Sequence, residues 1–135
     1  MSPRERIIDR FRERYGQPVS DAAAAVERGA IGGSFGASGY TTLAQAGALA
    51  GRLELRPGVR LLDVGAGRGW PGLYLAAQTG CEVVLADVPA PALRAALARA
   101  EEQGLLSRSS IVMASGTHLP FRGRSFDAVV HTDTL

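Results

Sequence analysis

The stretch Leu61-Leu62-Asp63-Val64-Gly65-Ala66-Gly67-Arg68-Gly69 decides the fold of this 135-residue chain. A short apolar strand runs into a glycine-rich turn, and apolar residues at helical spacing follow the turn. Open α/β sheets bind their ligands at such turns, where the carboxyl end of a strand leads into a helix. Glycines there permit positive φ and let backbone N–H groups approach a ligand, and the helix N-terminus favours an anionic group. The turn is therefore the first candidate binding site.

The spacing of these glycines argues against a dinucleotide site. The dinucleotide fingerprint is G-x-G-x-x-G, and its third glycine allows close packing of helix on strand. Counted from Gly65, that third position is Trp70. The pattern is instead acidic-x-G-x-G-x-G, with Asp63 at the end of the strand. A carboxylate there repels a pyrophosphate but suits a ligand with an ammonium group, such as S-adenosylmethionine. An NAD(P)-binding Rossmann protein remains the alternative from another class.

Strand and helix patterns alternate beyond the turn. We expect strands at 59–64, 82–86, 110–114 and 128–130, and helices at 71–79 and 91–103. This order predicts an α/β fold, a Rossmann-like parallel sheet with helices on its faces. Asp87 ends the second strand, where a carboxylate can accept hydrogen bonds from a ribose diol. The structural alternative is that Asp87 caps the helix that begins near Pro91.

Four motifs in this order resemble those of class I S-adenosylmethionine-dependent methyltransferases, and residues 41–135 resemble the front part of that family's domain. The motifs are Asp63–Gly69, Val83–Asp87, Gly116–Phe121 and Ser125–Val130. The resemblance implies a sheet of order 3-2-1-4-5-7-6, of which this chain holds strands 3-2-1-4. We therefore expect an incomplete sheet, with self-association possible through its open edge. A non-catalytic fragment or interaction module that retains the cofactor residues is a further alternative.

The resemblance also implies which residues bind the cofactor. The glycine-rich turn would line the methionine end, Asp87 would hold the ribose hydroxyls, and Val88 would contact the adenine. After the third strand many members place an acid that binds the adenine amino group, and here Ser115 takes that position. The full cofactor set is Asp63, Gly65, Ala66, Gly67, Gly69, Asp87, Val88, Ser115 and Gly116.

The acceptor side carries fewer signals. Methyl transfer is an in-line displacement, so the enzyme must mainly align the reactants, and a base is needed only if the acceptor loses a proton. His131 is a candidate base that Asp133 would orient, although polar residues are common at strand ends; the catalytic residue stays unassigned. Methyltransferases that act on amino groups of nucleic acids or proteins often carry an Asn/Asp-Pro-Pro-aromatic sequence after the fourth strand. Since this chain has none there, the resemblance implies a small-molecule O-, C- or N-acceptor. Arg68 either pairs with the cofactor carboxylate or is a solvated loop residue.

The residues before the sheet predict a separate N-terminal segment. Helices are expected at 4–15 and 21–28, and Thr42–Gln45 has the spacing of a capping box that starts a further helix. The glycine-rich stretch 29–39 is either a flexible linker or a lid that closes with Phe35 or Tyr40. We therefore divide the chain into 1–40, a helical and glycine-rich lid segment, and 41–135, a truncated S-adenosylmethionine-binding methyltransferase domain.

Composition excludes several other classes. All fifteen basic residues are arginine, and the net charge of +2 is carried by residues 1–15, with five arginines against three acids. The remainder is neutral, which argues against nucleic-acid binding. One cysteine, Cys81, and two histidines are too few for a zinc site, so no metal is expected. No signal-like start or long apolar run is present, so we expect a cytoplasmic protein that does not enter a membrane.

Overall fold

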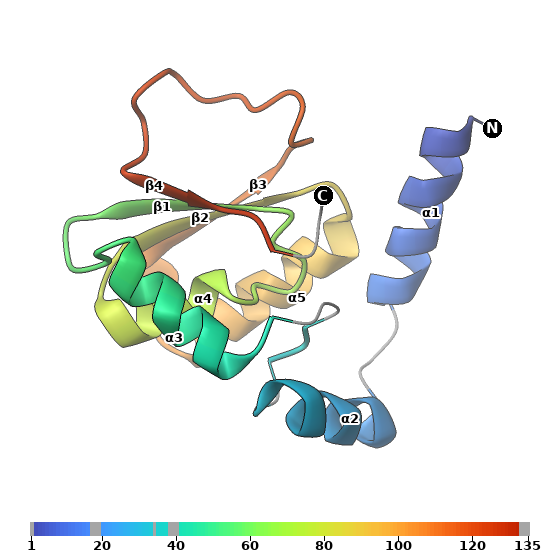
Figure 1. Cartoon of the computed structure of the whole chain (residues 1–135). Coiled ribbons are helices and arrows are strands. Elements are labelled where there is room, and N and C mark those ends of the chain that lie inside the picture. The colour runs from blue at the N-terminus through green and yellow to red at the C-terminus, as the bar shows by residue number, and fades with distance from the viewer. Residues whose placement is uncertain (1, 17–19, 34, 38–40, 133–135) are drawn as a thin grey trace.

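A four-stranded parallel sheet forms the centre of the molecule, with strand order β3-β2-β1-β4. The computed structural model describes residues 2–16, 20–33, 35–37 and 41–132. The predicted strand order is confirmed, and each strand lies within a residue of its expected place (Figure 1). The strands are β1 (Arg60–Val64), β2 (Glu82–Asp87), β3 (Ser109–Met113) and β4 (Ala128–Val130).

Five α-helices and one short 3₁₀ helix are found in the described part of the chain, and every expected helix is present. They are α1 (Pro3–Gly16), α2 (Asp21–Ile31), α3 (Leu43–Arg52), α4 (Gly72–Thr79), α5 (Ala90–Glu102) and η1 (Leu106–Arg108).

Local signals explain most helix ends. At α3 the Thr42 hydroxyl accepts from the Gln45 N–H at 3.1 Å, and the Gln45 amide accepts from the Thr42 N–H at 2.9 Å. This is the predicted capping box. The end of α2 differs from expectation, because the helix continues past Arg28 to the buried Ile31 and stops at Gly32, which has φ +105°. Part of the expected linker is therefore helical.

Helices α3, α4 and α5 all lie on one face of the sheet (Figure 1). Because side chains alternate along a strand, Leu61 and Val83 point to these helices and are almost fully buried. Burial of one such side chain stabilises the fold by about 1.5–3 kcal/mol. The expected parallel sheet with flanking helices is therefore confirmed, and among the described residues α3, α4 and α5 flank it on this face.

The other face of the sheet is covered by the segment between β3 and β4, which arches over it (Figure 1). Phe121 and Phe126 from this segment meet edge to face, with ring centroids 4.9 Å apart. They pack with Leu62 and Val84 of the sheet. Phe121 and Phe126 thus shield the apolar side chains on this face of the sheet from solvent.

No helix in the described ranges is long and apolar enough to cross a membrane.

Candidate functional site

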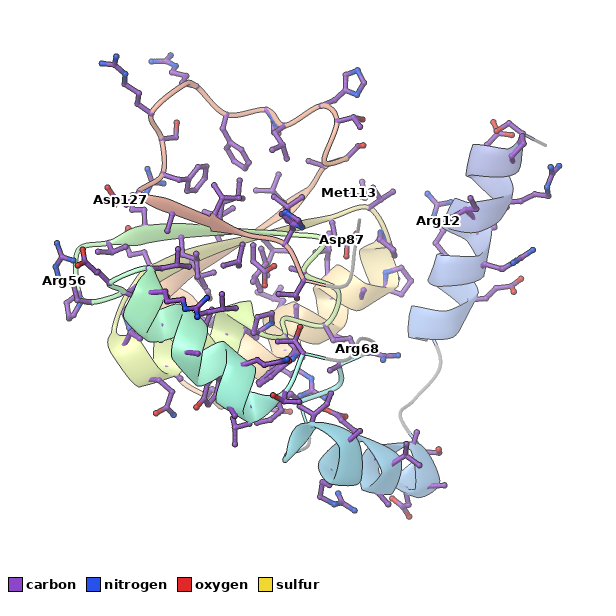
Figure 2. The ribbon with its side chains drawn as sticks, viewed as in Figure 1. Arg12, Arg56, Arg68, Asp87, Met113 and Asp127 are labelled. Atoms are coloured by element: carbon purple, nitrogen blue, oxygen red, sulfur yellow. The ribbon has the colours of Figure 1, made fainter. Side chains whose placement is uncertain are left out.

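The predicted site residues come together at the carboxyl edge of the sheet. Because the strands are parallel, the ends of β1, β2, β3 and β4 lie along this one edge. Figure 2 shows Asp87 and Met113 at this edge, on the side that faces α1, and Arg56 and Asp127 at the opposite edge. The residues predicted from all four strand ends therefore share one region of the surface.

The glycine-rich turn is tied to the end of β2 by its backbone. The N–H groups of Gly65 and Ala66 both donate to the Ala86 carbonyl, at 2.8 and 3.1 Å. The N–H of Gly67 donates to Asp87 Oδ2 at 2.8 Å. We expected these donors to face a ligand, but the structure uses all three to set the shape of the turn. The electrostatic part of the site therefore rests on side chains.

Packing requires the last glycine of the turn, Gly69, and a second glycine, Gly72, at the start of α4. Gly69 has φ +101°, and a Cβ there would lie 2.5 Å from Leu73 Cδ1. A Cβ on Gly72 would lie 2.7 Å from Asp63 Oδ2 and 2.6 Å from Leu85 Cδ2. Gly72 was not singled out from the sequence, and its importance is visible only once α4 is packed on β1.

Asp63 is a fully buried carboxyl group at the end of β1. Its Oδ2 accepts a hydrogen bond from the Gly72 N–H at 3.0 Å, and no donor among the described residues reaches Oδ1. Burial raises the pKa of Asp63 well above the ordinary value of 3.8; the hydrogen bond from Gly72 lowers it and the nearby Asp87 raises it. A buried acceptor without a donor is costly, so this oxygen marks a place where a donor would be favourable.

Asp87 links the turn to the end of β2. Its Oδ1 accepts from the Val88 N–H at 2.7 Å and its Oδ2 from the Gly67 N–H at 2.8 Å. Helix α5 begins after Pro89, which is its N-cap and makes no side-chain capping bond. The alternative that Asp87 caps this helix is therefore wrong.

Ser115 and Gly116 lie across the edge from the turn. The Ala114 N–H donates to the Asp87 carbonyl at 2.9 Å, which brings the chain after β3 beside the end of β2. A Cβ on Gly116 would lie 3.2 Å from Val64 Cγ1, at the end of β1. The half-buried Val88 and Ser115 and the exposed Gly116 thus border the same region as the two aspartates.

The candidate catalytic pair is only partly visible. His131 follows β4 directly and its side chain is exposed. Asp133, and Tyr40 of the proposed lid, lie outside the described residues. The pairing of His131 with Asp133 therefore stays a prediction.

Trp70 is a packing residue. It is 7% exposed and its Nε1 donates to the Thr41 carbonyl at 3.0 Å. The ring of Phe35 stacks on it, with centroids 4.1 Å apart and planes 21° apart. Phe35 therefore packs beside the start of α4.

Sequence reasoning missed Glu27, which is only 7% exposed on α2. Its carboxylate accepts from the backbone N–H groups of Phe35, Gly36 and Ala37. The only sequence signal was an acid in an alanine-rich helix, and partners eight to ten residues away follow no helical spacing.

Among the described residues, no group of three His, Cys, Asp or Glu side chains gathers in a way that could hold a metal ion.

Residues 61–135, more than half of the chain, match the methyltransferase-domain family. The chain belongs to this family. The match begins within β1 and includes the glycine-rich turn, Asp87 and the segment that covers the second face of the sheet. This methyltransferase-domain chain spans about a quarter of the length of the curated relatives it matches.

Similar proteins include methyltransferases and one cyclase. The nocamycin O-methyltransferase of Saccharothrix syringae is 42% identical over 80 residues, covering 57% of this chain and 28% of that protein. The [4+2]-cyclase SpnF superposes with a TM-score of 0.61 at 31% identity, over 70% of this chain and 35% of its own. An S-adenosylmethionine-dependent methyltransferase of Geobacter sulfurreducens, solved with S-adenosylhomocysteine, superposes with a TM-score of 0.50 at 30% identity. The match covers 54% of this chain and 29% of that protein.

Proposed function

We propose that this chain binds S-adenosylmethionine at the carboxyl edge of its sheet, for methyl transfer to a small-molecule acceptor. The observation that carries the proposal is the buried Asp63 Oδ1, which has no donor among the described residues and lies beside the glycine-rich turn. The solved complex of the Geobacter sulfurreducens protein with S-adenosylhomocysteine supports a cofactor of this type.

The donor set of the edge fits the methionine end of the cofactor. An ammonium group would donate to Asp63 Oδ1 and place a positive charge beside a carboxylate whose burial disfavours its charged form. The turn residues Gly65, Ala66, Gly67 and Gly69 would form the wall around this end.

The remaining residues fit the nucleoside end. Each carboxylate oxygen of Asp87 accepts one hydrogen bond, Oδ2 from the Gly67 N–H and Oδ1 from the Val88 N–H. A carboxylate has about four lone-pair sites in all. The free sites can accept a ribose diol. Val88 would contact the adenine, and Ser115 with Gly116 would border its edge.

S-adenosylmethionine, when bound, supplies a methyl group on a sulfonium that a nucleophile can displace. The chain's own contribution is to bind and orient, because an in-line displacement depends on alignment. Asp63 and Asp87 would anchor the two ends, and Trp70 would hold the helix after the turn in place. His131, with Asp133, would take a proton only from an acceptor that must lose one.

The acceptor is the least constrained part of the proposal. Similarity to the nocamycin O-methyltransferase supports a small-molecule acceptor. SpnF is named a cyclase, so likeness of fold alone does not assign the reaction. The division into a lid segment, 1–40, and a cofactor domain, 41–135, belongs to the proposal, as does a cytoplasmic location, with which the buried free thiol of Cys81 agrees.

Calorimetry with S-adenosylhomocysteine tests the cofactor assignment. We expect saturable binding, together with protection from thermal unfolding that NAD(P)H does not give. No binding at millimolar ligand would overturn the assignment. Transfer of labelled methyl to candidate acceptors is measured separately, because cofactor binding without transfer would favour the non-catalytic alternative.

A further inference from the structure

Glu27 holds the chain after α2 by three successive backbone N–H groups. Its Oε2 accepts from Gly36 at 3.2 Å, and its Oε1 accepts from Ala37 at 3.2 Å and also from Phe35. We call residues 35–37 the nest segment, because three N–H groups in a row converge on one anion.

The conformation of Gly36 makes this convergence possible. Its φ of +70° lies in the left-handed region and turns neighbouring amides toward the same point. A carboxylate that is 7% exposed needs such partners, since an unpaired buried charge is strongly unfavourable. Loss of the charge at position 27 should therefore release the nest segment.

The nest segment in turn lies against the glycine-rich turn and the residue that follows it. Phe35 stacks on Trp70, the residue directly after Gly69. A Cβ on Gly36 would lie 2.4 Å from Arg99 Nη2 on α5 and 3.1 Å from Arg68 Cδ in the turn. The segment therefore lies between the turn and α5, beside the Arg68 side chain of the turn and the Trp70 ring directly after it.

We propose that Glu27 is a positioning residue for the cofactor site, acting through the nest segment on Trp70 and Arg68. The inference rests on the proposed function, because it concerns the affinity of that same site. With the nest segment docked, the turn and the Arg68 side chain are held in one arrangement. When the segment is released, only the fraction of molecules with a correctly arranged turn can bind, and affinity falls by that fraction.

Two measurements on the 135-residue chain test the link, with Glu27→Gln as the variant and Glu102→Gln, an exposed glutamate at the end of α5, as its matched control. The first is S-adenosylhomocysteine affinity. The second is acrylamide quenching of tryptophan emission in the free protein, which reports on Trp70 alone because the chain has a single tryptophan.

For Glu27→Gln we expect about tenfold weaker S-adenosylhomocysteine binding, with stronger quenching of Trp70. Glu102→Gln should match the wild type in both, and Glu27→Asp should recover part of the affinity because it restores the charge. Phe35→Leu, which leaves the Glu27 carboxylate in place but removes the stack on Trp70, should weaken binding in the same way.

The outcomes separate the two ideas. If the wild type binds S-adenosylhomocysteine and Glu27→Gln has the same affinity and the same quenching as the wild type, the positioning role of Glu27 is overturned. If Glu27→Gln does not fold, normal affinity in the folded Phe35→Leu variant would overturn it instead. No binding by the wild type would overturn the proposed function, and the quenching data would still decide whether Glu27 holds the nest segment against Trp70.

Discussion

The two edges of the sheet each carry an aspartate on or beside the central strands, and the two aspartates are treated in opposite ways. Asp63 at the carboxyl edge is fully buried, and one of its oxygens has no donor among the described residues. Asp127 at the amino edge is exposed, and its Oδ2 accepts from the Arg60 N–H at 2.9 Å. The exposed Asp127 is therefore hydrogen-bonded within the protein, whereas the buried Asp63 has one oxygen without a donor among the described residues.

The amino edge is a network of mutually satisfied groups. Arg60 Nη1 donates to the Ser125 carbonyl at 3.0 Å, its Nε lies 3.6 Å from Glu82, and its guanidinium lies 5.4 Å from the centre of the Phe126 ring. The Asp127 N–H also donates to the Arg60 carbonyl at 2.9 Å, which ties the start of β4 to β1. The comparison indicates that the polar groups of the amino edge stabilise the fold. At the carboxyl edge, stability is given up where a ligand would bind.

Asp87→Ala should cause the largest loss of cofactor affinity. It removes the proposed ribose contacts and the bond to Gly67, and we expect about 2–4 kcal/mol, or about thirty- to a thousandfold, in S-adenosylhomocysteine affinity. Calorimetry measures it, and Asp127→Ala at the other edge is the control. Unchanged affinity in Asp87→Ala would remove this aspartate from the site.

Gly69→Ala should cause the largest loss of stability among single-methyl additions at this edge. The left-handed φ costs an alanine about 1–2 kcal/mol, and the clash with Leu73 adds about 1–3 kcal/mol. The matched control is Gly104→Ala, at φ +69° with nothing within 4 Å, which carries only the conformational cost. Equal denaturant midpoints for the two variants would show that α4 does not pack as described.

Asp63→Asn should stabilise the free protein at neutral pH while weakening cofactor binding. The pKa of Asp63 is raised in the folded state, so between the ordinary value and the raised value the folded protein binds a proton that the unfolded chain does not. Wild-type stability should therefore rise as pH falls through the raised pKa, and level off below the ordinary one.

In Asp63→Asn this contribution to the pH dependence should vanish. Thermal unfolding of both proteins across that pH range is the measurement. A variant that is less stable than the wild type at pH 7 would contradict the assignment of an unfavourable buried charge.

Asp127→Ala should have the smallest effect and sharpen the contrast between the edges. It removes the hydrogen bond from the Arg60 N–H, which is worth about 1 kcal/mol of stability. S-adenosylhomocysteine affinity should stay within a factor of about two, since the strand ends that form the site lie at the opposite edge. A tenfold loss of affinity would show that the two edges are coupled through β1 and β4.

Self-association through β4, the edge strand of the described sheet, stays a prediction. This strand pairs with β1, and Val129 is 54% exposed. Self-association through this edge would appear as a concentration-dependent mass in sedimentation.

Local chemistry accounts for what the sequence determined. Short-range periodicity set the helices and strands, Thr42 and Gln45 set a helix start, and the glycines of 65–69 marked the turn, because each depends on residues close in the chain. The alternation of strand and helix then sufficed to predict a parallel sheet, whereas the order β3-β2-β1-β4 was implied by the resemblance to the methyltransferase family.

Tertiary structure alone decided which polar groups meet. Asp127 and Arg60 are 67 residues apart, and Glu27 finds its three donors across a turn whose shape depends on Gly36. The burial of Asp63 follows from the packing of α4 at Gly72, and Phe121 and Phe126 reach Leu62 and Val84 of the sheet from the segment between β3 and β4. These contacts depend on the closing of long loops and on space left by neighbours, and neither is written in the local pattern of residues.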